Sequence, residues 1–514
     1  MLLPAFDALG MPYIPSTTLK GVAREMARRE LTKKEPSVTE EQIRDIFGEI
    51  ELTACLGKVI FLDAYPLPFT DIDSDNPDEL EGLVPDMANS IWTWNNNNPQ
   101  YKTNPNIFLS LRKPTFVIGL RLVTGADPAM LEHVKKWLYE GLAQGIGSRL
   151  NSGYGTFTIT NQTEQPKGAK QILSVKFQLR GQLIHGRQNF NNWVENRDRT
   201  GWKPPGIAQS EIRPPAFRSI LRYWFRTLAL GVLEPNIVKD WELKIFGGID
   251  PEARLGMFQL EIPDGKIVRD NGADSEKNCG YATGTLILRQ SQTTKQLSTE
   301  QKKALQNLLA SLTWLTFHLG GVGQGARRPC YSRQTRQYAP WWRGTSVKLI
   351  SQDKEDKYWN CPSTLESLQK RFRTSLNSFY TNLSTLTELP CDPSQPKTVA
   401  KTGNWAEAVD SNSRIICVQG DIINDKSPAL ALLHKQAKQS GNGYDRQLCG
   451  SINERSPIWI ARVGSPFKDD EGFGKKGFDI VTIFGVDNQK RQTYLNSLTQ
   501  LQHPIQEYRE IWHL

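Results

Sequence analysis

Several features that mark membrane, secreted and metal-binding proteins are missing from this sequence. No run approaches the ~18 apolar residues of a membrane span, and no signal peptide opens the chain. The seven cysteines contain no CxxC pair, and the six histidines are scattered. These absences argue against a membrane span, a disulfide framework and a structural zinc site. We therefore expect a soluble protein of the cytoplasm that holds no metal and no cofactor.

Positive charge, by contrast, is in excess. The 514 residues include 63 lysines and arginines against 54 acidic residues, which gives a formal net charge of +9. This balance favours an anionic partner, although net charge alone does not separate nucleic acid from a membrane surface. A chain of this length also has room for about two to four domains.

Four landmarks occur twice, in the same order. They are the start of a cationic helix, an Ile-Phe-Gly motif, a glycine ten residues beyond that Phe which begins an apolar run, and a glycine-rich basic segment. The pairs are residues 14–24 and 212–222, 46–48 and 245–247, 57–62 and 256–260, and 141–155 and 320–328. Such self-similarity predicts a tandem duplication of one domain type.

Alternating strands and helices predict an α+β chain with tandem modified ferredoxin-like (RRM-like) domains. The first domain is predicted over residues 1–162, a polar linker over 163–171 and the second domain over 172–343. Residues 344–514 are expected to form a mainly helical extension whose late strands return to the second domain. The segment 92–100 is rich in turn formers and is predicted to be an exposed loop.

The first copy differs from the second at its start. A predicted strand at residues 172–183 lies about thirty residues before the second cationic helix, whereas only fourteen residues precede Pro15. A ferredoxin-like unit needs that opening strand. Either the chain start is too far downstream or another segment fills the sheet edge, and we favour the first explanation. Residues 154–160 are expected to close the first copy as a strand.

The cations of each first helix recur at every fourth residue. The two trios are Lys20, Arg24 and Arg28, and Arg218, Arg222 and Arg226. This spacing places each trio on one helical face. No acid lies between Ile212 and Leu233, so the second trio has no local partner. Such arginines are suited to bidentate contact with phosphate, although a solvated face or ion pairs to distant carboxylates would also explain them.

The glycine-rich segment of residues 141–155 is the second signal. It follows a predicted helix, leads into a predicted strand, and combines five glycines with Arg149. Glycines let the backbone approach a polyanion and turn N–H groups toward it. The segment lacks the ending of a Walker loop and the strand-to-helix order of a Rossmann fingerprint. A helix C-cap and a tight turn would explain one or two of these glycines.

Together, these motifs resemble the RAMP superfamily of CRISPR effector subunits. The resemblance covers the landmarks of residues 12–160 and 172–335. Finer motifs are similar to the type III, Cmr-like branch, in which the first part resembles the sixth Cmr subunit and the second part resembles the first. These motifs are residues 86–89 and 146–155 for the former, and 213–226, 320–328 and 456–458 for the latter. The chain is therefore expected to be a fusion of two such subunits.

This resemblance implies a structural subunit of a type III CRISPR effector ribonucleoprotein in antiviral defence. Its partners would be CRISPR RNA, other effector subunits, and target RNA that pairs with the guide, with no membrane contact. The candidate RNA-binding residues are Lys20, Arg24, Arg28, Gly145, Gly147, Arg149, Asn151, Arg213, Arg218, Arg222, Gly321, Gly323, Arg327 and Arg328. Pro329 and Cys330 depart from the family's pattern, in which a glycine follows soon after Arg328.

Two other functions stay open. A metal-dependent target-RNA endoribonuclease would use Asp198, which lies in the loop where the family's cleaving subunits have an aspartate. His185 would serve a metal-independent ribonuclease as general base. Neither residue requires catalysis as an explanation. Asp198 could pair with the arginines beside it, and His185 could be a packing residue. The further alternative is a protein-only assembly scaffold, and we expect RNA binding rather than either.

Overall fold

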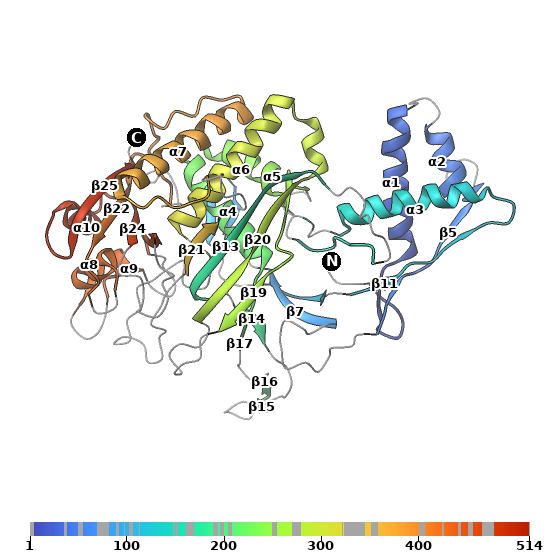
Figure 1. Ribbon diagram of the computed structural model, residues 1–514, viewed down its shortest axis with the longest axis horizontal. Coiled ribbons are helices and arrows are strands. Elements are labelled where there is room, and N and C mark those ends of the chain that lie inside the picture. The colour runs from blue at the N-terminus through green and yellow to red at the C-terminus, as the bar shows by residue number, and fades with distance from the viewer. Residues whose placement is uncertain are drawn as a thin grey trace. The chain divides into compact units, whose positions relative to one another are not determined.

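The structure of the protein is a computed structural model (Figure 1). It describes residues 5–34, 39–49, 55–68, 82–88, 92–96, 98–101, 106–112, 114–147, 150, 153–160, 169–183, 185–188, 194–195, 200–203, 208–248, 254–269, 279–320, 322, 345–350, 358–399, 407–423, 426–439, 444–450, 456–464 and 477–512. The chain divides into two compact units. Unit 1 is residues 1–88 with 106–170, and unit 2 is residues 89–105 with 171–514.

Unit 1 combines helices with short antiparallel strand pairs. The helices are α1 (Ser16–Lys34), α2 (Thr39–Phe47) and α3 (Pro128–Gln144). The strand pairs are β1 (Ala5–Phe6) with β2 (Pro12–Tyr13), β3 (Gly48–Glu49) with β4 (Cys55–Leu56), β5 (Val59–Phe61) with β12 (Leu120–Leu122), β6 (Tyr65–Pro66) with β11 (Phe116–Val117), and β7 (Gly82–Ala88) with β10 (Asn106–Arg112).

The core of unit 1 forms where α1 crosses α3. Leu19 and Ala23 of α1 and Leu138 of α3 are fully buried there. A Cβ atom at Gly141 would lie 2.3 Å from Val22 Cγ1. Glycine at this position therefore lets the two helices approach closely, which accounts for one glycine of the glycine-rich segment without any ligand.

Unit 2 contains a sheet with the ferredoxin-like strand order. Its chain order is β13 (Gln171–Gln182), α4 (Pro214–Ala229), α5 (Pro235–Phe246), β18 (Phe258–Glu261), β20 (Cys279–Gln290), α6 (Thr299–Leu319) and β21 (Thr345–Ile350). The spatial order is β18-β20-β13-β21, all antiparallel, with β19 (Lys266–Arg269) also on β20. Figure 1 labels β13, β19, β20 and β21 of this sheet. This βαββαβ arrangement, with α5 added, is the predicted fold.

A second sheet follows in the same unit. It is built from β22 (Ser413–Gly420), α8 (Pro428–Ala437), α9 (Arg446–Cys449), β23 (Ile458–Gly464), β24 (Gly477–Phe484), α10 (Gln489–Thr499) and β25 (Ile505–Trp512). The antiparallel order β23-β24-β22-β25 is again that of a ferredoxin-like unit. The prediction of a mainly helical extension is therefore not confirmed, because the late strands pair with one another rather than with the first sheet.

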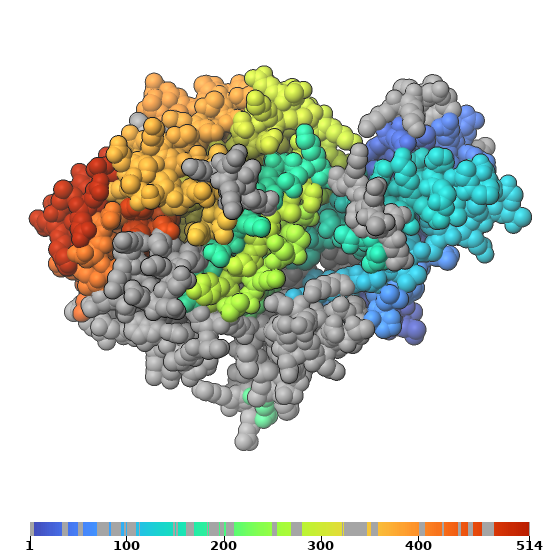
Figure 2. All heavy atoms as spheres, viewed as in Figure 1, coloured from blue at the N-terminus to red at the C-terminus, as the bar shows by residue number. Residues whose placement is uncertain are grey.

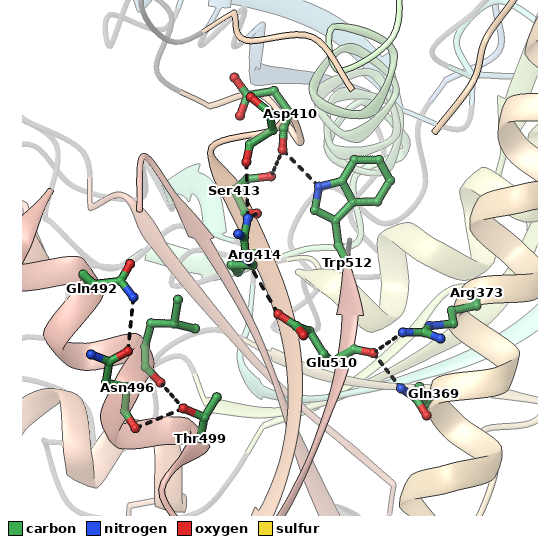
Figure 3. A network of polar contacts seen from close by, with 12 residues as sticks. Gln369, Arg373, Asp410, Ser413, Arg414, Gln492, Asn496, Thr499, Glu510 and Trp512 are labelled. Carbon is green, nitrogen blue, oxygen red and sulfur yellow. Dashed lines mark hydrogen bonds and ion pairs between the residues drawn. The ribbon is translucent and has the colours of Figure 1, made fainter. Parts of the chain in front are cut away.

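Helix α7 (Leu365–Thr387) and the first sheet share one hydrophobic core with one face of the second sheet. Figure 3 shows how the last strand is held at this junction. The Glu510 carbonyl oxygen accepts hydrogen bonds from Gln369 Nε2 (2.6 Å) and an Arg373 guanidinium nitrogen (3.0 Å), both on α7. Trp512 Nε1 donates to the Asp410 carbonyl oxygen at 3.0 Å. The other face of the second sheet packs on α8 and α10 as a separate core.

The repeated Ile-Phe-Gly landmark has the same geometry in both units. Gly48 and Gly247 each have positive φ (+75° and +68°) where a helix ends. A Cβ at Gly57 would lie 2.6 Å from the Phe47 carbonyl carbon, and one at Gly256 would lie 2.7 Å from the Phe246 carbonyl carbon. The next residue in each case donates its N–H to the isoleucine carbonyl, at 3.0 and 2.9 Å. The landmark therefore marks one recurring helix-to-strand connection.

The tandem arrangement of two RAMP domains and the predicted boundaries stay predictions, because the described strands of unit 1 pair only two at a time. The expected closing strand is absent from residues 153–160, which the structure describes without regular structure. Their backbone bonds instead to the end of α3, since Phe157 N donates to Leu142 O at 3.2 Å. In the described parts of the chain, no helix combines the length and apolarity needed to cross a membrane.

Candidate nucleic-acid interface

The cationic face of α1 lies at the surface of unit 1. Lys20, Arg24 and Arg28 are each half-exposed, while Leu19 and Ala23 between them face the core. Asp63 accepts a 2.6 Å hydrogen bond from the Ser16 backbone N–H and so caps the helix. The start of α1 is thus built from two segments, the motif of residues 15–24 and Asp63, which follows strand β5.

Arg28 differs from the other two cations of this row. Its guanidinium binds Glu40 at 2.8 Å and lies 3.6 Å from Glu25. The hydrogen bond between Arg28 and Glu40 raises the pKa of Arg28 and lowers the pKa of Glu40. Among the described residues, Lys20 makes no ion pair, and Arg24 Nε is a buried atom without a hydrogen-bond partner. Within this row, Lys20 and Arg24 are therefore the cations that no described carboxylate binds in an ion pair.

The glycine loop after α3 is closed by its own backbone. Ile146 N donates to Gly155 O at 2.9 Å, and a Cβ at Gly155 would lie 2.0 Å from Ile146 O. Gly145, Gly147, Gly153 and Gly155 all have positive φ. These glycines are needed for the turn itself, so their number alone does not demonstrate phosphate binding. Arg149 and Asn151 lie outside the described residues.

The cationic face of α4 forms ion pairs with an acidic residue of the same unit. Arg222 Nε and Arg226 Nε each lie 2.5 Å from a carboxylate oxygen of Glu242 on α5. Arg222 also donates to the Gly247 carbonyl oxygen at 3.2 Å, at the end of α5. Two arginines of this trio therefore follow the alternative of ion pairs to a distant carboxylate, because their partner comes from the next helix rather than from α4 itself.

This ion network is buried. Glu242 is 0% exposed and the Arg226 side chain is 2% exposed. Burial would raise the pKa of Glu242, but the charges and hydrogen bonds of the two guanidinium groups outweigh it and lower the pKa to about 2. Arg226 is therefore a structural residue, and Arg222 is mainly one. Arg213 is also largely buried and lies 3.2 Å from Glu211, whereas Arg218 is half-buried.

The segment predicted as an exposed loop is a hairpin that belongs to unit 2. β8 (Trp92–Asn95) pairs with β9 (Asn98–Tyr101). The Trp94 ring lies 5.1 Å from the Arg226 guanidinium carbon, and the Asn96 carbonyl oxygen accepts a 2.8 Å hydrogen bond from Lys239 Nζ. The prediction is therefore wrong. Asn96, with φ +52°, supplies the turn, and the alternating Trp-Thr-Trp followed by asparagines was the available hairpin signal.

The remaining candidates lie mostly outside the described residues. These are Asp198, Gly321, Gly323, Arg327 and Arg328. His185 lies in β14 (His185–Gln188), opposite Ser210 of β17 (Ala208–Ser210). In the described ranges, no group of three or more His, Cys, Asp and Glu side chains could hold a metal ion.

Comparison with curated proteins gives no match. Two solved structures are similar to this chain at low level. One is a chain of a type III-B Cmr-beta complex bound to cognate target RNA and AMPPnP, at 11% identity and a TM-score of 0.34, covering 62% of this chain and 95% of that one. The other is a chain of the type III-B Cmr-beta complex bound to cognate target RNA, at 12% identity and a TM-score of 0.33, covering 64% and 99%. These values are too low to assign a function.

A protein-family model matches the first part of the chain. That part holds the cationic face of α1, the Ile-Phe-Gly connection and the glycine loop. Residues 2–158 match the RAMP superfamily.

Proposed function

We propose that this protein is a non-catalytic, RNA-binding subunit of a type III CRISPR effector ribonucleoprotein in antiviral defence. The observation that carries the proposal is the RAMP superfamily match of residues 2–158. The matched region contains α1, whose cations face outward. The type III branch is proposed from the motif resemblance of residues 86–89 and 146–155. The partners would be CRISPR RNA, target RNA paired to it, and other effector subunits in the cytoplasm.

Lys20 and Arg24 are the strongest phosphate-binding candidates in unit 1. They lie one helical turn apart on α1, and the neighbouring Arg28 already binds Glu40. Two cations at this spacing can contact neighbouring phosphates along an extended RNA backbone. Binding through phosphates does not depend on base sequence, which suits a subunit that must accept many guides.

The double variant Lys20→Ala/Arg24→Ala tests this assignment. Loss of two phosphate contacts on single-stranded RNA should lower the slope of log affinity against log salt by about 1.4. Fluorescence anisotropy with a labelled RNA, read over a series of salt concentrations, measures that slope. The matched control is Lys135→Ala/Lys136→Ala, which removes the same charge from α3 where both lysines have acidic partners. Equal slopes for both double variants would contradict the α1 assignment.

The identity of the RNA needs a separate experiment. RNA that copurifies with the full chain from its native host should be short, uniform in length and carry repeat-derived ends. Random RNA that washes away in moderate salt would overturn the CRISPR assignment. Absence of any salt-sensitive RNA retention would favour a protein-only scaffold.

A further inference from the structure

The first sheet of unit 2 has one buried face and one polar face. Along β13, Val175, Phe177 and Leu179 are buried in the core. Lys176 and Arg180 alternate with them and point to the opposite face, where Lys176 is exposed and Arg180 is half-exposed. Green and yellow-green atoms of this sheet lie at the molecular surface in Figure 2. The second sheet differs, because both of its faces pack in hydrophobic cores.

Strand register brings the outward residues of neighbouring strands together. Arg180 of β13 lies opposite Tyr281 of β20. Lys266 of β19 lies opposite Thr283 of β20, and Lys348 of β21 lies opposite Gln178 of β13. Residues opposite each other in register share a face of the sheet. We call the set of Lys176, Arg180, Lys266, Tyr281 and Lys348 the sheet-face patch.

The two acids near this patch that the structure describes have hydrogen-bond partners. Asp264 accepts hydrogen bonds from the Thr285 backbone N–H at 2.6 Å and from Thr285 Oγ1 at 2.7 Å. Partial burial would raise the pKa of Asp264, but these bonds and the charge of Lys176 lower it. Glu261 binds Arg289 at 2.5 Å. In the described part of this surface, the four cations lie near two carboxylates, those of Asp264 and Glu261, and both carboxylates accept hydrogen bonds.

Tyr281 gives the patch a flat aromatic component. The residue is 38% exposed, and the Arg180 guanidinium carbon lies 4.3 Å from the centroid of its ring. A stacked arginine and tyrosine present a planar surface on which a nucleobase can stack. Cations on both sides of an aromatic platform are the arrangement that holds single-stranded nucleic acid, whose bases are free to stack.

We propose that the sheet-face patch is a second RNA-binding surface, which stacks a base of single-stranded RNA on Tyr281 and Arg180 and holds the flanking phosphates with Lys176, Lys266 and Lys348. The inference rests on the proposed function because it takes RNA as the ligand. It concerns a different unit from the cationic face of α1. A duplex is a poorer ligand because its base faces are already stacked on one another.

Binding of the full chain to a single-stranded RNA of about 12 nucleotides tests this proposal. Tyr281→Ala should weaken the affinity by about tenfold, whereas Tyr281→Phe, which keeps the ring, should leave it nearly unchanged. Lys348→Ala should lower the salt slope by about 0.7. Photocrosslinking of a 4-thiouridine-substituted RNA of the same length, followed by mass spectrometry, should yield an adduct at or next to Tyr281.

The outcomes separate the two RNA surfaces. If Tyr281→Ala and Lys348→Ala bind as the unchanged protein does while Lys20→Ala/Arg24→Ala binds more weakly, the sheet-face proposal is overturned and the proposed function stands. If Tyr281→Phe loses as much affinity as Tyr281→Ala, stacking on the ring is excluded. If the unchanged protein binds no RNA, both proposals fail. Circular dichroism of each variant shows that the exposed substitutions leave the fold intact.

Discussion

The two cationic helices have the same spacing of charge but different surroundings. In unit 2, Arg222 and Arg226 of α4 bind Glu242, four residues before Phe246 of the Ile-Phe-Gly motif. In unit 1 the position four residues before the motif's Phe is Ile43, which is fully buried. Among the described residues of unit 1 no acidic side chain is buried.

The residue at this position of the neighbouring helix therefore affects whether the cations are buried in ion pairs or remain at the surface. With an acid there, the arginines turn inward and join α4 to α5. With an apolar residue there, Lys20 and Arg24 stay half-exposed and can contact an external anion, while Arg28 pairs with the exposed Glu40. Repetition of a charge pattern in a sequence is thus no guarantee that its function repeats.

The largest effect should follow from Glu242→Gln. The substitution leaves two guanidinium groups, one of them fully buried, without their carboxylate, and should lower the free energy of unfolding by about 3–5 kcal/mol. Urea unfolding followed by tryptophan fluorescence measures the loss. Glu40→Gln, which removes the exposed partner of Arg28, should change stability by less than about 1 kcal/mol. Equal losses of stability in the two variants would show that the buried ion network on α4 is no more important to the fold than the exposed ion pair on α1.

The next largest effect should be a loss of stability at acidic pH, caused by His318 of unit 2. Its ring stacks on Trp314 with centroids 4.0 Å apart, and its Nδ1 lies 2.7 Å from the Trp314 carbonyl oxygen. Burial lowers the pKa of His318 from 6.5 to about 4, and nearby Arg371 also lowers it. Below pH 6.5 the unfolded chain therefore binds a proton that the folded chain does not.

Stability should accordingly fall as the pH drops from 6.5 toward 4, by about 1.4 kcal/mol per pH unit for this group. Urea unfolding at several pH values measures the dependence. His318→Gln should reduce it, while His133→Gln, at an exposed position on α3 of unit 1, should leave it unchanged. Persistence of the full dependence in His318→Gln would refute the assignment to His318.

A smaller loss of stability should follow from replacing the equivalent glycine in either unit. Gly57→Ala and Gly256→Ala each place a Cβ within 2.6–2.9 Å of backbone atoms at the end of the preceding helix. Each should therefore destabilise the protein by about 1–3 kcal/mol. Gly21→Ala is the control, because nothing lies within 4 Å of a Cβ at that helical position. Thermal unfolding of the three variants compares them, and a neutral Gly57→Ala beside a costly Gly256→Ala would show that the two connections are not equivalent.

The smallest effect should be a gain of RNA affinity. Glu40→Gln removes the carboxylate that neutralises Arg28 on α1, so it should tighten RNA binding about twofold to fivefold at low salt. Anisotropy titration measures the change. Glu132→Gln, next to Lys135 on α3, is the matched control. Weaker binding by Glu40→Gln would show that the α1 face does not meet the RNA.

Local features of this chain could be predicted from sequence, and long-range partners could not. The Ile-Phe-Gly connections and the helix over residues 214–229 depend on nearby glycines, prolines and apolar spacing, which the sequence displays directly. The pairing of Arg226 with Glu242 depends on how two helices cross, which no local pattern encodes. Late strands were expected, but their pairing into a second sheet was not, because strand partners distant in sequence leave no local pattern. β24, which is buried along its whole length, also shows no alternation of polar and apolar residues that would mark one face.

The hairpin of β8 and β9 has a consequence for dividing the chain. It lies in sequence between segments of unit 1, yet its Trp94 covers Arg226 of unit 2. Cutting the gene at the predicted linker would give one product with an uncovered tryptophan and another whose buried arginine has lost its aromatic cover. The two halves are therefore not interchangeable parts, and a variant that divided the chain at this point would first have to replace this hairpin.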